Sequence, residues 1–82
     1  MFTIYTKKPN GDQRCKYCDW SKELLNKNNL KFTEIECETA PWIFKELNHT
    51  SYPLIFKYIG EGATEYVGGY DELQELLMWE DV

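Results

Sequence analysis

The spacing of hydrophobic and polar positions changes several times along the chain, and each change marks an expected element. Short apolar or alternating runs predict four strands, at residues 2–6, 31–37, 53–59 and 63–67. Apolar spacings of three and four predict helices from Cys15 to about Asn28, over 40–48 and over 68–79. The predicted order is therefore β-α-β-α-β-β-α.

This order of elements indicates an α/β fold. A strand–helix–strand unit places its two strands in parallel, whereas the short turn GEG at 60–62 makes the last two strands antiparallel. We expect a four-stranded mixed sheet with three helices on its two faces, in one domain over 1–82. The second strand should turn Ile35 and Cys37 toward the core. Thr39 should cap the second helix, with Pro41 in its first turn.

The composition narrows the classes of function. The chain has 82 residues, of which 43% are hydrophobic, and a net charge of −5. An acidic chain is not expected to bind nucleic acid, which requires clustered cations. No run approaches the roughly 20 apolar residues of a membrane span. Because Met1 leads directly into the first predicted strand, we expect no leader segment and a cytoplasmic location.

Positive charge is concentrated around the segment RCKYC at 14–18. The cations of this region are Lys7, Lys8, Arg14, Lys16 and Lys22. Such a concentration in an acidic chain suggests an anionic ligand, although chance clustering in a solvated loop explains it equally well.

Cys15 and Cys18 are the strongest candidates for chemistry. Cys15 lies at the expected start of a helix, where unpaired N–H groups and the helix dipole stabilise a thiolate. Arg14 and Lys16 add positive charge, so we expect a lowered pKa for the Cys15 thiol and assign it as the attacking group. Cys18 is one turn further into the helix, and we expect it to be buried and to resolve the mixed disulfide.

A zinc site and a pair of inert core thiols are the two alternatives to a redox pair. A zinc site needs four ligands, and Cys15, Cys18, Cys37 and His49 supply that number, but with poor spacing. Inert core thiols are disfavoured because a turn-rich loop precedes the pair. A CxxC motif beside a βαβ pattern favours redox exchange. Cys37 is then expected to be a small core residue, and His49 a surface residue near a helix end.

Several motifs occur in the order typical of one family. They are IYTK at 4–7, CKYC at 15–18, SKELL at 21–25, SYPLIF at 51–56 and GGYDEL at 68–73. With these motifs the chain resembles the glutaredoxins over nearly its whole length. The resemblance implies a thioredoxin fold and a glutathione-dependent thiol–disulfide oxidoreductase, with Pro53 in the cis form facing the disulfide.

The resemblance also implies a glutathione site. The Tyr52 backbone beside Pro53 would pair with the cysteine moiety of glutathione. The helix start at Tyr70 and Asp71, preceded by Gly69, would hold the γ-glutamyl end. Further contacts are implied for Tyr17 in the groove and for Lys7, or Lys8 or Arg14 in its place, at the glycyl carboxylate. No metal is implied, and we expect a monomer.

Departures from the family pattern leave other functions open. The segment between Lys7 and Cys15 is long, a feature that resembles phage-encoded glutaredoxins, and it suggests ribonucleotide reductase as a partner. Lys16 replaces the usual proline, which is expected to shift the redox potential. The alternatives are a thioredoxin-like reductant served by a flavoprotein reductase, or an iron–sulfur cluster carrier. The missing thioredoxin motif and the presence of GGYDEL argue against the thioredoxin-like reductant. Lys16 argues against the iron–sulfur cluster carrier.

Overall fold

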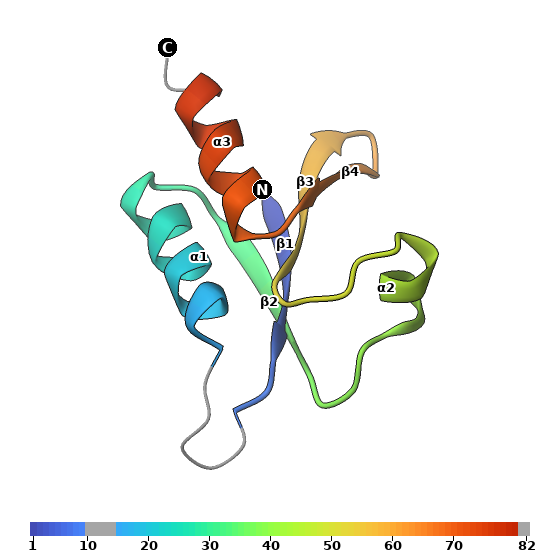
Figure 1. The fold of residues 1–82 in the computed structure, drawn as a ribbon. Helices are drawn as coiled ribbons and strands as arrows, with labels where there is room; N and C mark the ends of the chain where they lie inside the picture. Colours follow the sequence, from blue (N-terminus) through green and yellow to red (C-terminus); the bar gives the residue numbers. More distant parts are fainter. Residues whose placement is uncertain (10–14, 81–82) are drawn as a thin grey trace.

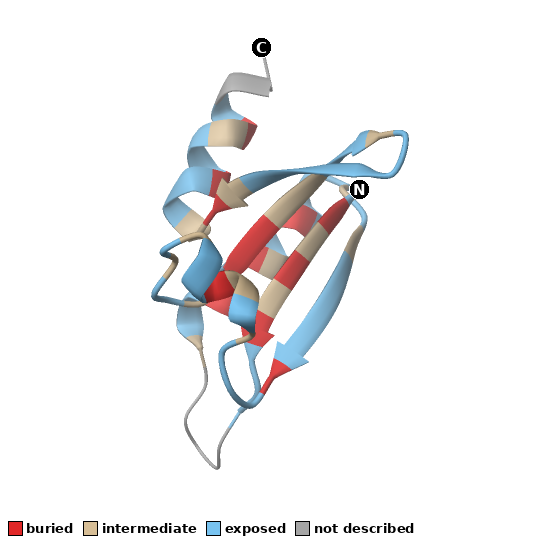
Figure 2. Ribbon diagram, turned by 90° about the vertical axis from the view of Figure 1, so that its right-hand side faces the viewer, coloured by how far each residue is buried: buried red, intermediate tan, exposed pale blue. Residues whose placement is uncertain are grey.

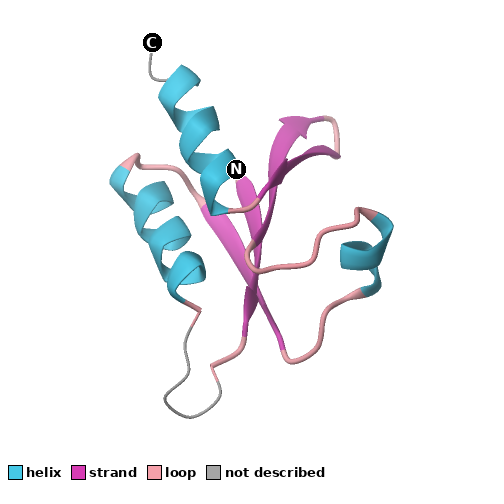
Figure 3. Ribbon diagram, in the orientation of Figure 1, coloured by secondary structure: helices cyan, strands magenta, loops and turns pink. Residues whose placement is uncertain are grey.

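The computed structural model describes residues 1–9 and 15–80, and the predicted order of elements is confirmed. The elements are β1 (Phe2–Lys7), α1 (Lys16–Lys27), β2 (Phe32–Cys37), α2 (Trp42–Glu46), β3 (Leu54–Gly60), β4 (Ala63–Gly68) and α3 (Tyr70–Glu80) (Figures 1 and 3). Most bounds lie within two residues of the prediction. No helix in the described ranges is both long and apolar enough to cross a membrane.

The four strands form one mixed sheet in the order β2-β1-β3-β4. Strand β1 pairs in parallel with β2 and antiparallel with β3, and β3 pairs antiparallel with β4. Helices α1 and α3 lie side by side on one face of this sheet, and α2 lies on the other face (Figure 1). The predicted three-layer α/β architecture is therefore confirmed.

The main core lies between the sheet and the helices α1 and α3. It is built by one face of the two central strands and by the inward faces of the two helices: Phe2, Ile4, Ile55, Leu25, Leu73 and Leu77. Figure 2 shows buried and intermediate positions alternating along the central strand β1, as expected when successive side chains point to opposite faces of a sheet. This packing holds α1 and α3 against the two central strands.

Aromatic rings fill the opposite face of the sheet, under α2. Phe44 of α2 makes edge contacts with Tyr5 of β1 and packs against Tyr52, with ring centroids 6.3 and 4.9 Å apart. Phe56 of β3 contacts both Tyr5 and Tyr66. These contacts hold the segment that precedes β3 against the sheet.

Two expectations about this face are wrong. Ile35 is exposed, because the five-residue helix α2 packs its Phe44 over β1 and leaves the edge strand β2 uncovered at Ile35, whereas Cys37 at the end of β2 is buried as expected. Thr39 does not cap α2: the N-cap is Pro41, which makes no side-chain capping bond. The helix is therefore shorter than the predicted 40–48.

Helix α2 ends in a Schellman motif. The N–H of Asn48, which has φ of 52°, donates to the Lys45 carbonyl at 3.2 Å. The N–H of His49 donates to the Phe44 carbonyl at 2.8 Å. This arrangement closes the helix and fixes the direction in which the chain continues toward Pro53.

Candidate active site

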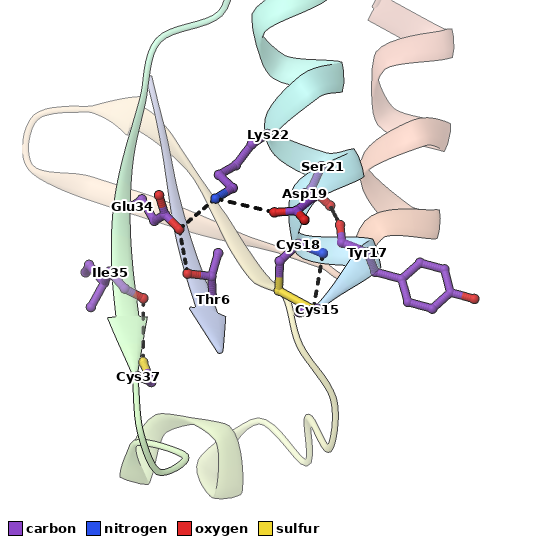
Figure 4. Close-up of polar contacts among 10 residues, drawn as sticks. All are labelled: Thr6, Cys15, Tyr17, Cys18, Asp19, Ser21, Lys22, Glu34, Ile35 and Cys37. Carbon is purple, nitrogen blue, oxygen red and sulfur yellow. Dashed lines mark hydrogen bonds and ion pairs between the residues drawn. A yellow bond between two sulfur atoms is a disulfide. The ribbon is translucent and has the colours of Figure 1, made fainter. Parts of the chain in front are cut away.

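The site is centred on the N-cap of helix α1. Cys15 is the N-cap, with an extended backbone, and its Sγ accepts a hydrogen bond from the N–H of Cys18 at 3.2 Å. Cys15 and Cys18 form a disulfide across a Cα–Cα distance of 5.2 Å (Figure 4). An N–H group in the first turn of a helix has no acceptor within the helix and stabilises negative charge nearby. The bond from the Cys18 N–H therefore supports a Cys15 thiolate after reduction.

The two sulfur-bearing residues differ in exposure. Cys15 is partly exposed, whereas Cys18 is only 2% exposed. A nucleophile arriving from solvent therefore reaches Cys15 first. This difference agrees with the expected division into an attacking and a resolving cysteine.

A small polar network lies beside the disulfide and joins α1 to the sheet. Glu34 of β2 accepts hydrogen bonds from Thr6 at 2.7 Å and from Lys22 at 3.0 Å, and Lys22 also contacts Asp19 at 3.7 Å (Figure 4). Burial acts to raise the pKa of Glu34, but the hydrogen bonds from Thr6 and Lys22 outweigh it, so the pKa lies below its ordinary value. The network fastens the first turns of α1 to β1 and β2.

The lowered pKa of Glu34 predicts a contribution to stability that depends on pH. A carboxylate whose pKa is lower in the folded state stabilises the fold above its unfolded-state pKa, and the effect is lost as pH falls through the folded value. We expect Glu34→Gln to lower the free energy of unfolding by about 0.5–1 kcal/mol at neutral pH. In urea denaturation at several pH values, the gap from wild type should close in acid.

Glu36→Gln is the matched control, because Glu36 lies on the same strand and makes no ion pair with any residue in the described ranges. It should change stability less than Glu34→Gln at neutral pH. An equal loss in both variants would contradict the role assigned to the network.

The cations near the cysteines do not all face the site. Lys22 is engaged by Glu34, and Lys8 pairs with Glu38 at 3.1 Å. Lys7 and Lys16 are exposed and have no ion pair within 1–9 and 15–80. Lys7 lines a cleft of about 110 Å³ together with both cysteines. Arg14 lies outside the described residues.

A groove beside the start of α3 brings together five of the residues that the resemblance assigned to glutathione. It has a volume of about 290 Å³ and is lined by Tyr17, Ser51, Tyr52, Gly69, Tyr70, Asp71 and Glu72. Pro53, the residue that follows Tyr52, is buried. The peptide bond between the two residues is cis, as expected. Lys7 does not line this groove but the separate cleft around the disulfide.

Three exposed or partly exposed rings connect the starts of α1 and α3. Tyr17 and Trp20 of α1 both contact Tyr70 of α3, with centroid distances of 5.9 and 5.8 Å. The Tyr17 ring points away from the Lys22–Glu34 network (Figure 4). These contacts set the position of Tyr17 and Tyr70 at one side of the groove.

Sequence reasoning did not assign Ser51, Glu72 or His49 to the site. The Glu72 side chain accepts a hydrogen bond from the Gly69 N–H at 2.8 Å, as the third helical residue does in a capping box. The spacing of Gly69 and Glu72 was a usable signal for that contact. His49 has no such signal, since its partners, Pro53 and Tyr66, are set by the tertiary fold.

Cys37 is not placed for exchange with the disulfide. It is 7% exposed at the end of β2, its thiol is 3.6 Å from the Ile35 carbonyl, and burial raises its pKa. In the described part of the chain, no group of three or more His, Cys, Asp or Glu side chains is arranged to hold a metal.

Comparison with known proteins places this geometry in a family. The glutaredoxin family model matches residues 2–59. The chain belongs to the glutaredoxin family. A curated glutaredoxin of Pseudomonas aeruginosa is 38% identical over 62 residues, which span 76% of this chain and 73% of the relative.

Solved glutaredoxin structures share the fold. The solution structure of a Brucella melitensis glutaredoxin has a TM-score of 0.68 and 27% identity, over 95% of this chain and 78% of that one. Francisella tularensis glutaredoxin 1, solved with cacodylate, gives 0.68 at 23% identity, over 96% and 93%. The chain is therefore a thiol–disulfide oxidoreductase of the glutaredoxin family, with Cys15 and Cys18 as its redox pair. The resemblance to phage glutaredoxins stays a prediction.

Proposed function

We propose that this glutaredoxin reduces disulfides at the expense of glutathione. The observation that carries the proposal is the groove of Tyr17, Tyr52, Gly69, Tyr70 and Asp71, whose lining residue Tyr17 lies two residues after the N-cap Cys15. A ligand in this groove has one end at the start of α3. In the proposal its centre extends toward Cys15, as a tripeptide with a central cysteine requires.

The groove offers partners for two parts of glutathione, the cysteine moiety and the γ-glutamyl end. The backbone of Tyr52, which directly precedes the cis-Pro53, pairs with the cysteine moiety as an added strand would. Because the Gly69 N–H is taken by Glu72, the γ-glutamyl carboxylate uses the N–H groups at Tyr70 and Asp71. The Asp71 carboxylate receives the ammonium group.

The glycyl carboxylate lies on the other side of the disulfide in this arrangement. Lys7 lines the cleft there with both cysteines and has no ion pair in the described ranges, so it is available for that carboxylate. Arg14 is the second candidate for this role in the proposal.

Two routes of thiol–disulfide exchange follow. In the monothiol route the Cys15 thiolate attacks a glutathionylated substrate, forms a Cys15–glutathione disulfide and releases the substrate thiolate. A second glutathione thiolate then frees Cys15 and leaves as oxidised glutathione. In the dithiol route Cys15 attacks a protein disulfide, and Cys18 displaces the substrate, giving the Cys15–Cys18 disulfide. Ribonucleotide reductase is the protein partner proposed from the resemblance.

Asp71→Asn tests the groove directly. It removes the carboxylate proposed for the ligand ammonium, so we expect KM for a glutathionylated peptide to rise about 10-fold with little change in kcat. Glu75→Gln, one turn further along α3 and outside the groove, is the charge-matched control and should leave KM unchanged.

Wild-type protein that is reduced by a flavoprotein thioredoxin reductase but not by glutathione would contradict the proposal. A brown, cluster-containing protein without exchange activity would contradict it as well and would favour the carrier alternative.

A further inference from the structure

His49 connects three segments that meet behind the groove. Its Nε2 lies 3.0 Å from the Pro53 carbonyl oxygen, and its Nδ1 lies 2.7 Å from the Tyr66 hydroxyl. The imidazole also stacks edge-on against Phe44 and Tyr66, at centroid distances of 5.6 and 5.8 Å. Its backbone N–H is held by the Schellman motif of α2, so both the main chain and the ring are fixed.

These contacts determine the tautomer of the neutral ring. A carbonyl oxygen can only accept a hydrogen bond, so Nε2 must carry the proton that is donated to Pro53. Nδ1 then has a lone pair and accepts from the Tyr66 hydroxyl. Both ring nitrogens are therefore satisfied by the protein, in an arrangement expected of a residue that orients its neighbours.

The partners of His49 are attached to the two walls of the groove. Pro53 directly follows Tyr52 on one wall, and Tyr66 leads through Val67 and Gly68 to Gly69 on the other. A methyl group added at Gly69 would lie 3.6 Å from the Pro53 carbonyl oxygen and 3.9 Å from His49 Cε1. The ring therefore lies against the place where the two walls come together.

We infer that His49 is a positioning residue that sets the separation of the two walls, and through it the preference for glutathionylated substrates. The inference rests on the proposed function, and it assigns to His49 a role in recognition rather than in the exchange step. Because Pro53 receives the Nε2–H, this bond is the one that holds the Tyr52 wall. The bond from Tyr66 holds the ring itself.

Two amide variants separate the two bonds. In His49→Gln the side-chain amide nitrogen takes the approximate place of Nε2, whereas in His49→Asn it takes the place of Nδ1. Both variants lose the ring contacts equally, so each is the control for the other. Reduced protein is mixed in single-turnover experiments with one peptide carrying either a glutathionyl or a cysteinyl mixed disulfide. The readout is the ratio of the two second-order rate constants.

We expect His49→Asn to lower this ratio about 3- to 10-fold, the usual effect of one hydrogen bond, and His49→Gln to retain most of it. If a His49 variant instead lowered the reactivity of the Cys15 thiolate, both rate constants would fall together and their ratio would stay unchanged. An unchanged ratio in His49→Asn, with a wild type that does prefer the glutathionyl peptide, would overturn the inference. A wild type without that preference would instead overturn the proposed function.

The ring tautomer gives a test that does not depend on activity. Imidazole ¹⁵N shifts of the wild-type protein, recorded at a pH where His49 is neutral, should show the proton on Nε2. A proton on Nδ1 would mean that the bond to Pro53 is absent, and the inference would fail.

Discussion

Replacement of Cys15 by serine is expected to abolish turnover of both glutathionylated and protein disulfide substrates, by about 10³-fold or more. A serine hydroxyl does not ionise near neutrality, so the hydrogen bond from the Cys18 N–H has no anion to stabilise. The measurement is the rate of glutathione-dependent reduction of a small mixed disulfide. The reaction is monitored through the consumption of a coupled reductant.

Cys18→Ser is the matched variant and should separate the two routes. It leaves Cys15 at the start of α1 with the same backbone donor, so the monothiol reaction should persist. Reduction of a protein disulfide should be lost, because no second thiol resolves the intermediate. Equal loss of the monothiol reaction in both variants would contradict the roles assigned to the two cysteines.

Gly68→Ala is expected to lower the free energy of unfolding by about 2 kcal/mol or more. Gly68 has φ of 123°, a conformation that residues with a side chain rarely adopt. An added Cβ would lie 2.6 Å from Oε1 and 2.8 Å from Cγ of Glu72. The Glu72 side chain would have to leave the Gly69 N–H that it now accepts from.

Urea denaturation measures this loss. With a denaturant slope of about 1 kcal/mol/M, a loss of that size moves the midpoint by about 2 M. Gly69→Ala is the control for stability, since its Cβ would meet atoms no closer than 3.5 Å. It should cost less than about 1 kcal/mol. A Gly68→Ala variant as stable as Gly69→Ala would show that the backbone at 68 has no need of glycine.

The sequence was sufficient for the order of the elements and for the redox pair. Changes in the spacing of apolar residues located β1, β3 and the long helices, because the inward positions of these elements all face one continuous core. Cys15 and Cys18 could be assigned because a helix start acts on the sulfur through local geometry alone. The position of Tyr17 relative to Tyr70 followed from family resemblance and not from periodicity.

The rest depended on tertiary packing that local patterns do not contain. Ile35 has the spacing of a core residue, yet it is exposed because the short helix α2 does not reach the edge strand. The role of His49 depends on Pro53 and Tyr66, which come from a loop and a different strand. Only the folded chain brings these three residues together.

The unequal exposure of Cys15 and Cys18 determines the direction from which reductants approach. Exchange requires an incoming sulfur to align with the bond that it breaks, and only the Cys15 end of that bond is open to solvent. Every electron pair therefore enters and leaves through one atom. Selection among reductants is then a question of which thiols can align at that atom, in addition to their relative redox potentials.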